Sequence, residues 1–330
     1  MIQKYPSITP HVEFLWTCMS YSWDIFRGVR LATEIIFPNS SMKLVEKIYK
    51  ENQLSDYMNE VVAWTIVSYV NRRKEDLKEN EKIKILEIGA GTGGTSSVVF
   101  RDLKQYKDIV TYDYTDISEA FMKYGKSMYG AENPYVNYRL FNVEKDPVAQ
   151  SYESKTYDIV IATNVLHATR NIRNTIQNTK VLLRKNGWIV MNEITTLEDF
   201  LTLTFGLLDG WWLYEDESNR ISNSPILSNQ LWAEALTKEG YQNVKTFGQK
   251  KDSQISLMQS IIVAESNGEI SLSGEPNRTV ITKQSKKTEQ PKVKEVRSAK
   301  EHIIKDSFKE EEIAFAVEEA ILDSLSFVLQ

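Results

Sequence analysis

The sequence predicts an α/β fold, with a doubly wound, mostly parallel sheet and a helical N-terminal lid. Short apolar segments alternate with helical segments between residues 82 and 265, a pattern typical of βαβ units. The first apolar segment runs directly into a glycine-rich turn, as in doubly wound folds. Residues 8–75 instead show helical periodicity, and no parallel strand is visible there.

The N-terminal lid is expected to cover residues 1–78. Its apolar residues recur at helical spacing in two groups, Val12, Leu15, Trp16 and Met19, then Met42, Val45, Ile48 and Tyr49. The stretch Phe37-Pro38-Asn39-Ser40-Ser41 separates the two helical groups, and its serines can cap the second helix.

The core of the fold is expected to cover residues 79–265. Its predicted strands are residues 83–88, 108–116, 157–163 and 188–193, with 136–141 also strand-like and 244–247 and 260–264 as late strands. The two late strands are expected to close the sheet as an antiparallel pair. A helix is expected to stop at Asn186-Gly187, and residues 197–216 to form one aromatic helix.

The C-terminal residues differ in composition from the core. Residues 266–300 contain Ser, Gly, Pro and Lys without apolar periodicity, which predicts a flexible linker. Residues 301–330 are expected to form an amphipathic helix, whose apolar face contains Ile313, Val317, Ile321, Leu325 and Val328.

Composition limits the classes of function. The net charge is −5 and no basic stripe is present, so a nucleic-acid partner is not expected. No apolar run has the length of a membrane span. Cys18 is the single cysteine and the three histidines are scattered, so neither a disulfide nor a metal site is expected. These features predict a cytoplasmic protein.

The segment 87–94 reads Glu-Ile-Gly-Ala-Gly-Thr-Gly-Gly. Its glycines permit a tight turn and let a ligand approach bare backbone. Gly89, Gly91 and Gly94 also satisfy the dinucleotide pattern, which makes an NAD-dependent dehydrogenase the competing interpretation. Glu87 disfavours it, because a carboxylate opposes a pyrophosphate at the helix N-terminus, whereas S-adenosylmethionine carries a sulfonium and an ammonium. We therefore expect this cofactor to be bound by Glu87, Gly89, Gly91 and Gly93.

Three further polar residues follow expected strands and are candidates for cofactor binding. Asp116 is placed to accept hydrogen bonds from ribose hydroxyls; the alternative is that it caps a helix from Ser118 onward. Asn142 can contact the adenine amino edge or simply belong to a surface turn. Asn164 lies just past the strand 157–163, where ligands of open α/β sheets bind.

His167 and Glu193 are the candidate catalytic residues. Each follows a predicted strand, and neighbouring parallel strands can bring both side chains together above the sheet. A histidine paired with a carboxylate is a general base whose tautomer is fixed. The alternatives are a structural histidine bonded to backbone and a helix-capping carboxylate. Proximity to the glycine turn favours the catalytic pair.

The sequence resembles the C-methyltransferase domains of modular polyketide synthases of the trans-acyltransferase type. The segments Asn164–Thr169 and Leu203–Asp216 carry the most specific part of the resemblance. The other matching stretches are Ile8–Cys18, Phe37–Met42, Ile85–Ser96, Tyr114–Ser118 and Asn192–Thr195. Together they cover most of residues 8–265.

The resemblance implies a catalytic dyad at His167 and Glu193, a lid over the acceptor, and an acceptor on the phosphopantetheine arm of an acyl carrier protein. It also implies neighbouring polyketide synthase domains, and residues 301–330 resemble the first helix of a following carrier protein. Asn142 departs from the family pattern, in which an Asp contacts adenine; an Asn still offers an acceptor oxygen. Phe205, Trp211 and Trp212 can line an acyl pocket, or pack in the core as aromatic residues commonly do.

The resulting hypothesis is methyl transfer from S-adenosylmethionine to the α-carbon of a β-ketoacyl thioester. One histidine and no expected metal favour carbon, because the methylene between two carbonyls is acidic. The closest alternative is O-methylation of a β-hydroxyl or enol by the same dyad. A catalytically silent domain that only docks a carrier is the alternative of another class.

Overall fold

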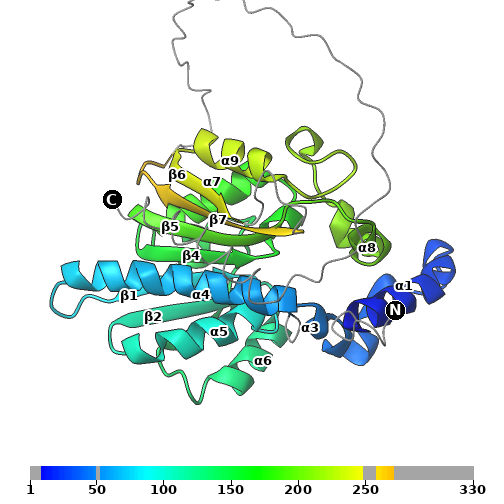
Figure 1. Cartoon of the computed structure of the whole chain (residues 1–330), viewed down its shortest axis with the longest axis horizontal. Coiled ribbons are helices and arrows are strands. Elements are labelled where there is room, and N and C mark those ends of the chain that lie inside the picture. Colours follow the sequence, from blue (N-terminus) through cyan, green and yellow to red (C-terminus); the bar gives the residue numbers. More distant parts are fainter. Residues whose placement is uncertain (1–8, 50–52, 248–257, 271–330) are drawn as a thin grey trace, which may run out of the picture. The chain divides into compact units, whose positions relative to one another are not determined.

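The computed structural model describes residues 9–49, 53–247 and 258–270. The described residues form a seven-stranded sheet in the order β3-β2-β1-β4-β5-β7-β6 (Figure 1). The strands are β1 (Ile83–Ile88), β2 (Val110–Asp116), β3 (Val136–Leu140), β4 (Tyr157–Thr163), β5 (Leu183–Ile194), β6 (Tyr241–Phe247) and β7 (Gln259–Ser266). Strands β1 to β5 pair in parallel, and β7 runs antiparallel to β5 and β6. The predicted doubly wound sheet with its antiparallel closing pair is confirmed.

Helices cover both faces of the sheet because the strands alternate their side chains. Leu86 and Ile88 join an apolar cluster with residues of α7 (Ile172–Leu182) and α9 (Asn229–Lys238). Glu87, between them, faces the other way and meets α5 (Gly94–Leu103). Helix α4 (Gln53–Arg73) packs on α5 and on β5, while α6 (Glu119–Tyr129) packs on β2 and β3.

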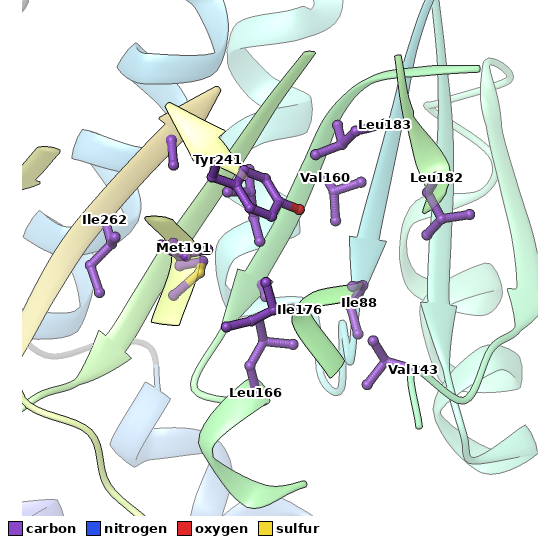
Figure 2. Close-up of a cluster of buried hydrophobic side chains, with 14 of the residues drawn as sticks. Ile88, Val143, Val160, Leu166, Ile176, Leu182, Leu183, Met191, Tyr241 and Ile262 are labelled. Carbon is purple, nitrogen blue, oxygen red and sulfur yellow. The ribbon is translucent and has the colours of Figure 1, made fainter. Parts of the chain in front are cut away.

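The larger apolar cluster lies between the sheet and helices α7 and α9. Figure 2 shows Ile88, Val160 and Met191 of three neighbouring strands facing Ile176 of α7. All four are at most 2% exposed, and each such burial contributes roughly 1.5–3 kcal/mol. Leu166 enters the same cluster from the loop after β4, so that loop is anchored in the core.

The N-terminal helices are α1 (Thr9–Phe26), α2 (Ala32–Ile36) and α3 (Lys43–Tyr49). They share a small core containing Phe14 and Ile48, which also packs on Phe205. The predicted break at 37–41 contains the 3₁₀ turn Pro38–Ser40. After it, Ser41 Oγ accepts the Lys43 N–H at 3.4 Å. Helix α4 falls within the residues assigned to the lid, but it packs on the sheet layer.

The prediction of one helix over 197–216 is wrong. The segment forms the short helix α8 (Asp199–Leu203) followed by 3₁₀ turns at Phe205–Leu207 and Asp209–Trp212. Thr204 and Leu208 have non-helical ψ angles of −80° and 136°, and Gly206 and Gly210 lower the helical propensity. Packing of the aromatic side chains on the lid and the sheet therefore outweighs the apolar periodicity.

The expected helix end at Asn186-Gly187 is also wrong, because α7 ends at Leu182 and β5 begins at once. Asn186 adopts a left-handed φ of 62°, which asparagine tolerates well. It lies inside β5, where the pairing with β4 shifts register. The Asn-Gly pair thus marks a strand irregularity.

The linker and helix expected within 266–330 lie outside the described residues from residue 271 onward. Residues up to Ser266 belong to β7. Among the described helices, none combines the length and apolarity that crossing a membrane requires.

Candidate active site

The carboxyl ends of four parallel strands bring most of the predicted site residues to one edge of the sheet. Strand β1 ends before the glycine turn and β2 ends at Asp116. Asn164 and His167 follow β4, and Glu193 is the penultimate residue of β5. Because these strands are parallel neighbours, their ends form the crevice in which ligands of this fold class bind.

The glycine turn has a backbone conformation that other residues seldom adopt. Gly89, Gly91 and Gly93 have φ angles of 64°, 57° and 77°. A Cβ on Gly89 would lie 2.2 Å from Val165, and one on Gly93 would lie 2.5 Å from the Tyr129 ring. A Cβ on Gly91 would meet nothing closer than 3.8 Å. Gly89 and Gly93 therefore permit close packing of protein side chains, whereas the backbone of Gly91 stays open to a ligand.

Asp116 braces the glycine turn from the end of β2. Its Oδ2 accepts the N–H of Gly91 at 3.1 Å, and its Oδ1 accepts the N–H of Ser118 at 2.9 Å. Burial raises the pKa of the Asp116 carboxyl, opposed by these backbone hydrogen bonds. Asp116 does not cap α6, because Ser118 is the N-cap residue of that helix; the contact with Ser118 is a local turn contact two residues along, and the contact with Gly91 adds a direct link to the glycine turn.

Glu87 lies beneath the turn and is 2% exposed. Its Oε2 accepts hydrogen bonds from Ser96 Oγ at 2.5 Å and from Tyr112 Oη at 2.6 Å. Burial raises the pKa of Glu87 to about 7, although these two hydrogen bonds act in the opposite direction. The carboxyl therefore fastens α5 to β1 and β2, and its observed partners are protein groups.

The two candidate asparagines hold loop backbone. Asn164 has a left-handed φ of 51°, and its Oδ1 accepts the N–H of Ile194 at 3.1 Å, which ties the ends of β4 and β5 together. Asn142 Oδ1 accepts the N–H of Glu144 at 2.9 Å, as in a surface turn. Their cofactor roles remain predictions.

His167 and Glu193 form a buried pair. His167 lies in the 3₁₀ turn Leu166–Ala168, and its Nδ1 lies 2.6 Å from Glu193 Oε2. The exposed fractions of the two residues are 5% and 0%. A carboxylate only accepts, so Nδ1 carries the proton and the Nε2 lone pair remains for chemistry. Among the described residues, none is hydrogen-bonded to Nε2.

Glu193 also fixes the backbone of the histidine loop, residues 164–169, which follows β4 and carries His167. Its Oε1 accepts the N–H groups of Val165 at 3.1 Å and Leu166 at 2.8 Å. One carboxylate thus orients the imidazole and the turn that carries it. Three donors on a fully buried carboxylate compensate for the desolvation of its charge.

Trp211 lies against this pair, and aromatic residues of the lid pack on the segment 197–216. The Trp211 ring lies edge-on to His167 with centroids 6.3 Å apart, and Phe205 contacts Phe14 of α1 at 5.2 Å. Tyr49 of α3 packs on Phe205. Burial, and then the charge of Glu193, raise the pKa of the Tyr49 phenol. Tyr49 was expected only as an apolar residue of a lid helix and not as a site residue, because nothing local in the sequence connects it to the strand ends.

Comparison with known proteins identifies the family. Residues 86–189 match a family model described as a methyltransferase domain. Polyketide synthase PksR of Bacillus subtilis (strain 168) is 47% identical over 258 residues, which are 78% of this chain and 10% of PksR. The solved DszA carbon methyltransferase is 43% identical, with a TM-score of 0.77 over 81% of this chain and 68% of that one. The chain belongs to the carbon methyltransferase domains of polyketide synthases.

A second carbon methyltransferase structure, that of CurJ, supports this assignment with 30% identity and a TM-score of 0.72. It covers 80% of this chain and 69% of that chain. The present chain is therefore an S-adenosylmethionine-dependent methyltransferase with the class I Rossmann-like fold. The dehydrogenase alternative is excluded. The chain spans about a tenth or less of PksR and of a second synthase, PksM.

The site of this methyltransferase domain fits its cofactor in two respects. No atom of the described residues lies closer than 3.8 Å to a Cβ position at Gly91, which leaves room for a ligand beside this backbone. Asp116, hydrogen-bonded to that same turn, retains acceptor capacity on both oxygens for ribose hydroxyls. We predict that Gly91 and Asp116 contact the part of S-adenosylmethionine that its demethylated product retains, so product binding tests this prediction without the reaction.

Replacing Gly91 with leucine is expected to weaken binding of the demethylated cofactor by about tenfold or more. A steric clash between the leucine side chain and the cofactor that costs about 1.4 kcal/mol of binding free energy already has that effect. Gly28→Leu is the matched control, because Gly28 is also left-handed at φ 70° and has nothing within 4 Å of its Cβ position. Titration calorimetry measures both. Equal affinities for the two variants would show that Gly91 does not line the cofactor site.

Proposed function

We propose that this domain methylates the α-carbon of a β-ketoacyl thioester presented by an acyl carrier protein, with His167 as the general base. The observation that carries the proposal is the buried His167–Glu193 pair at the ends of β4 and β5, one strand away from the glycine turn. The pair supplies a base of fixed tautomer beside a cofactor cradle, which is what carbon methylation requires.

Bound S-adenosylmethionine would supply an electrophilic methyl group, and its sulfur would keep the electron pair of the S–CH₃ bond that breaks, leaving the neutral demethylated cofactor. His167 Nε2 takes the α-proton of the acceptor, and the electron pair of that C–H bond becomes the new C–C bond. The imidazolium that forms is balanced by Glu193, whose Oε2 already accepts from Nδ1 at 2.6 Å. Water later removes the proton from Nε2 and restores the neutral base.

Three aromatic residues were candidates either for lining an acyl pocket or for packing in the core, and their surroundings differ. Trp211 is 7% exposed, lies against His167, and its indole N–H has no partner among the described residues. A buried donor without a partner is unfavourable, so a substrate carbonyl is a suitable acceptor. Phe205 joins the lid to this region. Trp212 is 48% exposed, and its N–H is donated to Gly206 O.

A carrier-bound acceptor is supported by the identity of the relatives. PksR and PksM are polyketide synthases many times longer than this chain, so the matching region of each is accompanied by other synthase regions. We propose that the acceptor reaches His167 on the phosphopantetheine arm of an acyl carrier protein, with α1 to α3 as the lid over it.

A 3-ketoacyl thioester on a carrier protein is expected to be methylated at C2, while the matching 3-hydroxyacyl thioester is not methylated. The methylene between two carbonyls is acidic enough to be deprotonated by an imidazole base, whereas the hydroxyl proton of an alcohol is much less acidic. Incubation with isotopically labelled methyl donor, followed by mass spectrometry of the carrier arm, locates the methyl group.

A methyl group on oxygen, or faster consumption of the hydroxyacyl substrate, would overturn carbon methylation in favour of O-methylation. Cofactor binding without transfer to either substrate would favour a silent carrier-docking domain. The carrier without an acyl group serves as the control for transfer to other positions.

A further inference from the structure

A second buried ion pair, between Arg220 and Asp216, lies next to the segment that carries His167. Arg220 and Asp216 are linked by a 2.5 Å contact between Nε and Oδ1, and their side chains are 0% and 4% exposed. Removing two charges from water is unfavourable unless each is well paired and hydrogen-bonded. The partners of this pair therefore indicate what it stabilises.

Those partners are backbone groups of the segment that carries His167. Arg220 Nη1 donates to the carbonyl oxygen of His167 itself at 2.6 Å, and Nη2 donates to that of Thr169 at 2.7 Å. Nη1 also donates to Pro225 O at 2.6 Å. The planar guanidinium has donors fixed in one fork, so it holds these acceptors at set positions relative to one another.

Asp216 extends the same clamp to the next helix. Its Oδ2 accepts the N–H of Ile172, the first residue of α7, at 2.7 Å. The segment between His167 and α7 is thus fixed at two carbonyls by Arg220 and at one N–H by Asp216. Glu193 fixes the N–H groups just before His167. The backbone of the base is therefore held from both sides.

We propose that the Arg220–Asp216 pair is a positioning element for His167, which sets where Nε2 lies relative to the acceptor. The proposal rests on the function proposed above. It is distinct from the dyad because neither residue contacts the imidazole: Arg220 acts through the backbone carbonyl of His167, and Asp216 acts through Arg220 and the N–H of Ile172. Displacement of a reacting group by about 1 Å can cost about a hundredfold in rate, so a clamp of this kind has a measurable kinetic effect.

Arg220→Lys tests the proposal, because lysine keeps the positive charge for Asp216 but cannot reach three carbonyl oxygens as a fork. We expect kcat for the ketoacyl substrate to fall by about ten- to a hundredfold, with affinity for the demethylated cofactor unchanged. In a His167→Ala background, the same change is expected to cause no further loss of the residual rate, because the residue it positions is gone.

Arg73→Lys is the matched control. Arg73 is also the partner of a buried carboxylate, Asp158, and is itself partly buried, but it lies on α4, and Asp158 lies at the opposite end of β4 from His167. It is expected to lower thermal stability and leave kcat unchanged. The proposal fails if Arg220→Lys keeps the wild-type kcat, or if its loss is equally large with and without His167. Since oxygen and carbon acceptors both need a base, this comparison stays decisive even if the wild type methylates oxygen.

Discussion

Replacing His167 with alanine is expected to lower the rate of methyl transfer by about two to four orders of magnitude, the usual contribution of a general base. Affinity for S-adenosylmethionine is expected to persist, because the glycine turn and Asp116 are held by contacts that do not involve the imidazole. The loss should therefore appear in kcat and leave the cofactor cradle intact.

The measurement pairs single-turnover kinetics on a carrier-bound ketoacyl substrate with calorimetry of the demethylated cofactor. Thermal unfolding checks that the variant keeps its stability. A retained stability indicates that Leu166, the chain neighbour of His167, stays in the apolar cluster. A His167→Ala protein that binds cofactor and methylates at nearly the wild-type rate would show that another group takes the proton.

Glu193→Gln is expected to have the second largest effect, about ten- to a hundredfold in kcat, an estimate below the loss of the base itself. Glutamine retains one carbonyl oxygen, which can accept from Val165 and Leu166 as Oε1 does now. Its amide N–H₂ then faces Nδ1 of His167, and a donor there favours the tautomer that protonates Nε2. The imidazole survives, but its basic atom points the wrong way for part of the time.

Asp158→Asn is the matched control for this substitution. Asp158 is also a buried carboxylate with several donors, among them the backbone N–H of Lys84 and the side chains of Arg73 and Arg184. It lies at the start of β4, whereas His167 follows the end of that strand. Both variants should lose stability, by about 1–3 kcal/mol per unsatisfied buried group, while only Glu193→Gln should lose kcat. Equal rates for the two variants would mean that Glu193 has only a structural role.

The strands were predictable because their signal is local. Strands β1 and β4 have the predicted bounds, 83–88 and 157–163, since apolar runs bounded by turn residues suffice to define a buried parallel strand. The prediction of one helix over 197–216 failed because the spacing of apolar residues indicates which side chains are buried. It does not determine the backbone conformation that carries them. Here Gly206 and Gly210 and the contacts of Phe205 with the lid determine the backbone.

The site was predictable to the extent that it follows from strand ends. The approach of His167 to Glu193 follows from the parallel pairing of β4 and β5, so adjacency in the sheet was enough. Tyr49 and Arg220 were not among the predicted site residues, because only the fold brings Tyr49 within the influence of Glu193, and Arg220 to the carbonyl of His167, from more than fifty residues away in the sequence. Glu87 was selected for its charge, yet its partners Ser96 and Tyr112 became known only with the fold.

Exchange of the α-proton with solvent tests the central claim, that His167 removes this proton, without any methyl transfer. The 3-ketoacyl carrier substrate is incubated in D₂O with the protein and no methyl donor, and deuterium at C2 is followed by mass spectrometry. The wild type is expected to accelerate exchange well above the rate without protein, and His167→Ala is expected to return it to that rate. Equal exchange with the wild type and with His167→Ala would contradict the assignment of His167 as the base.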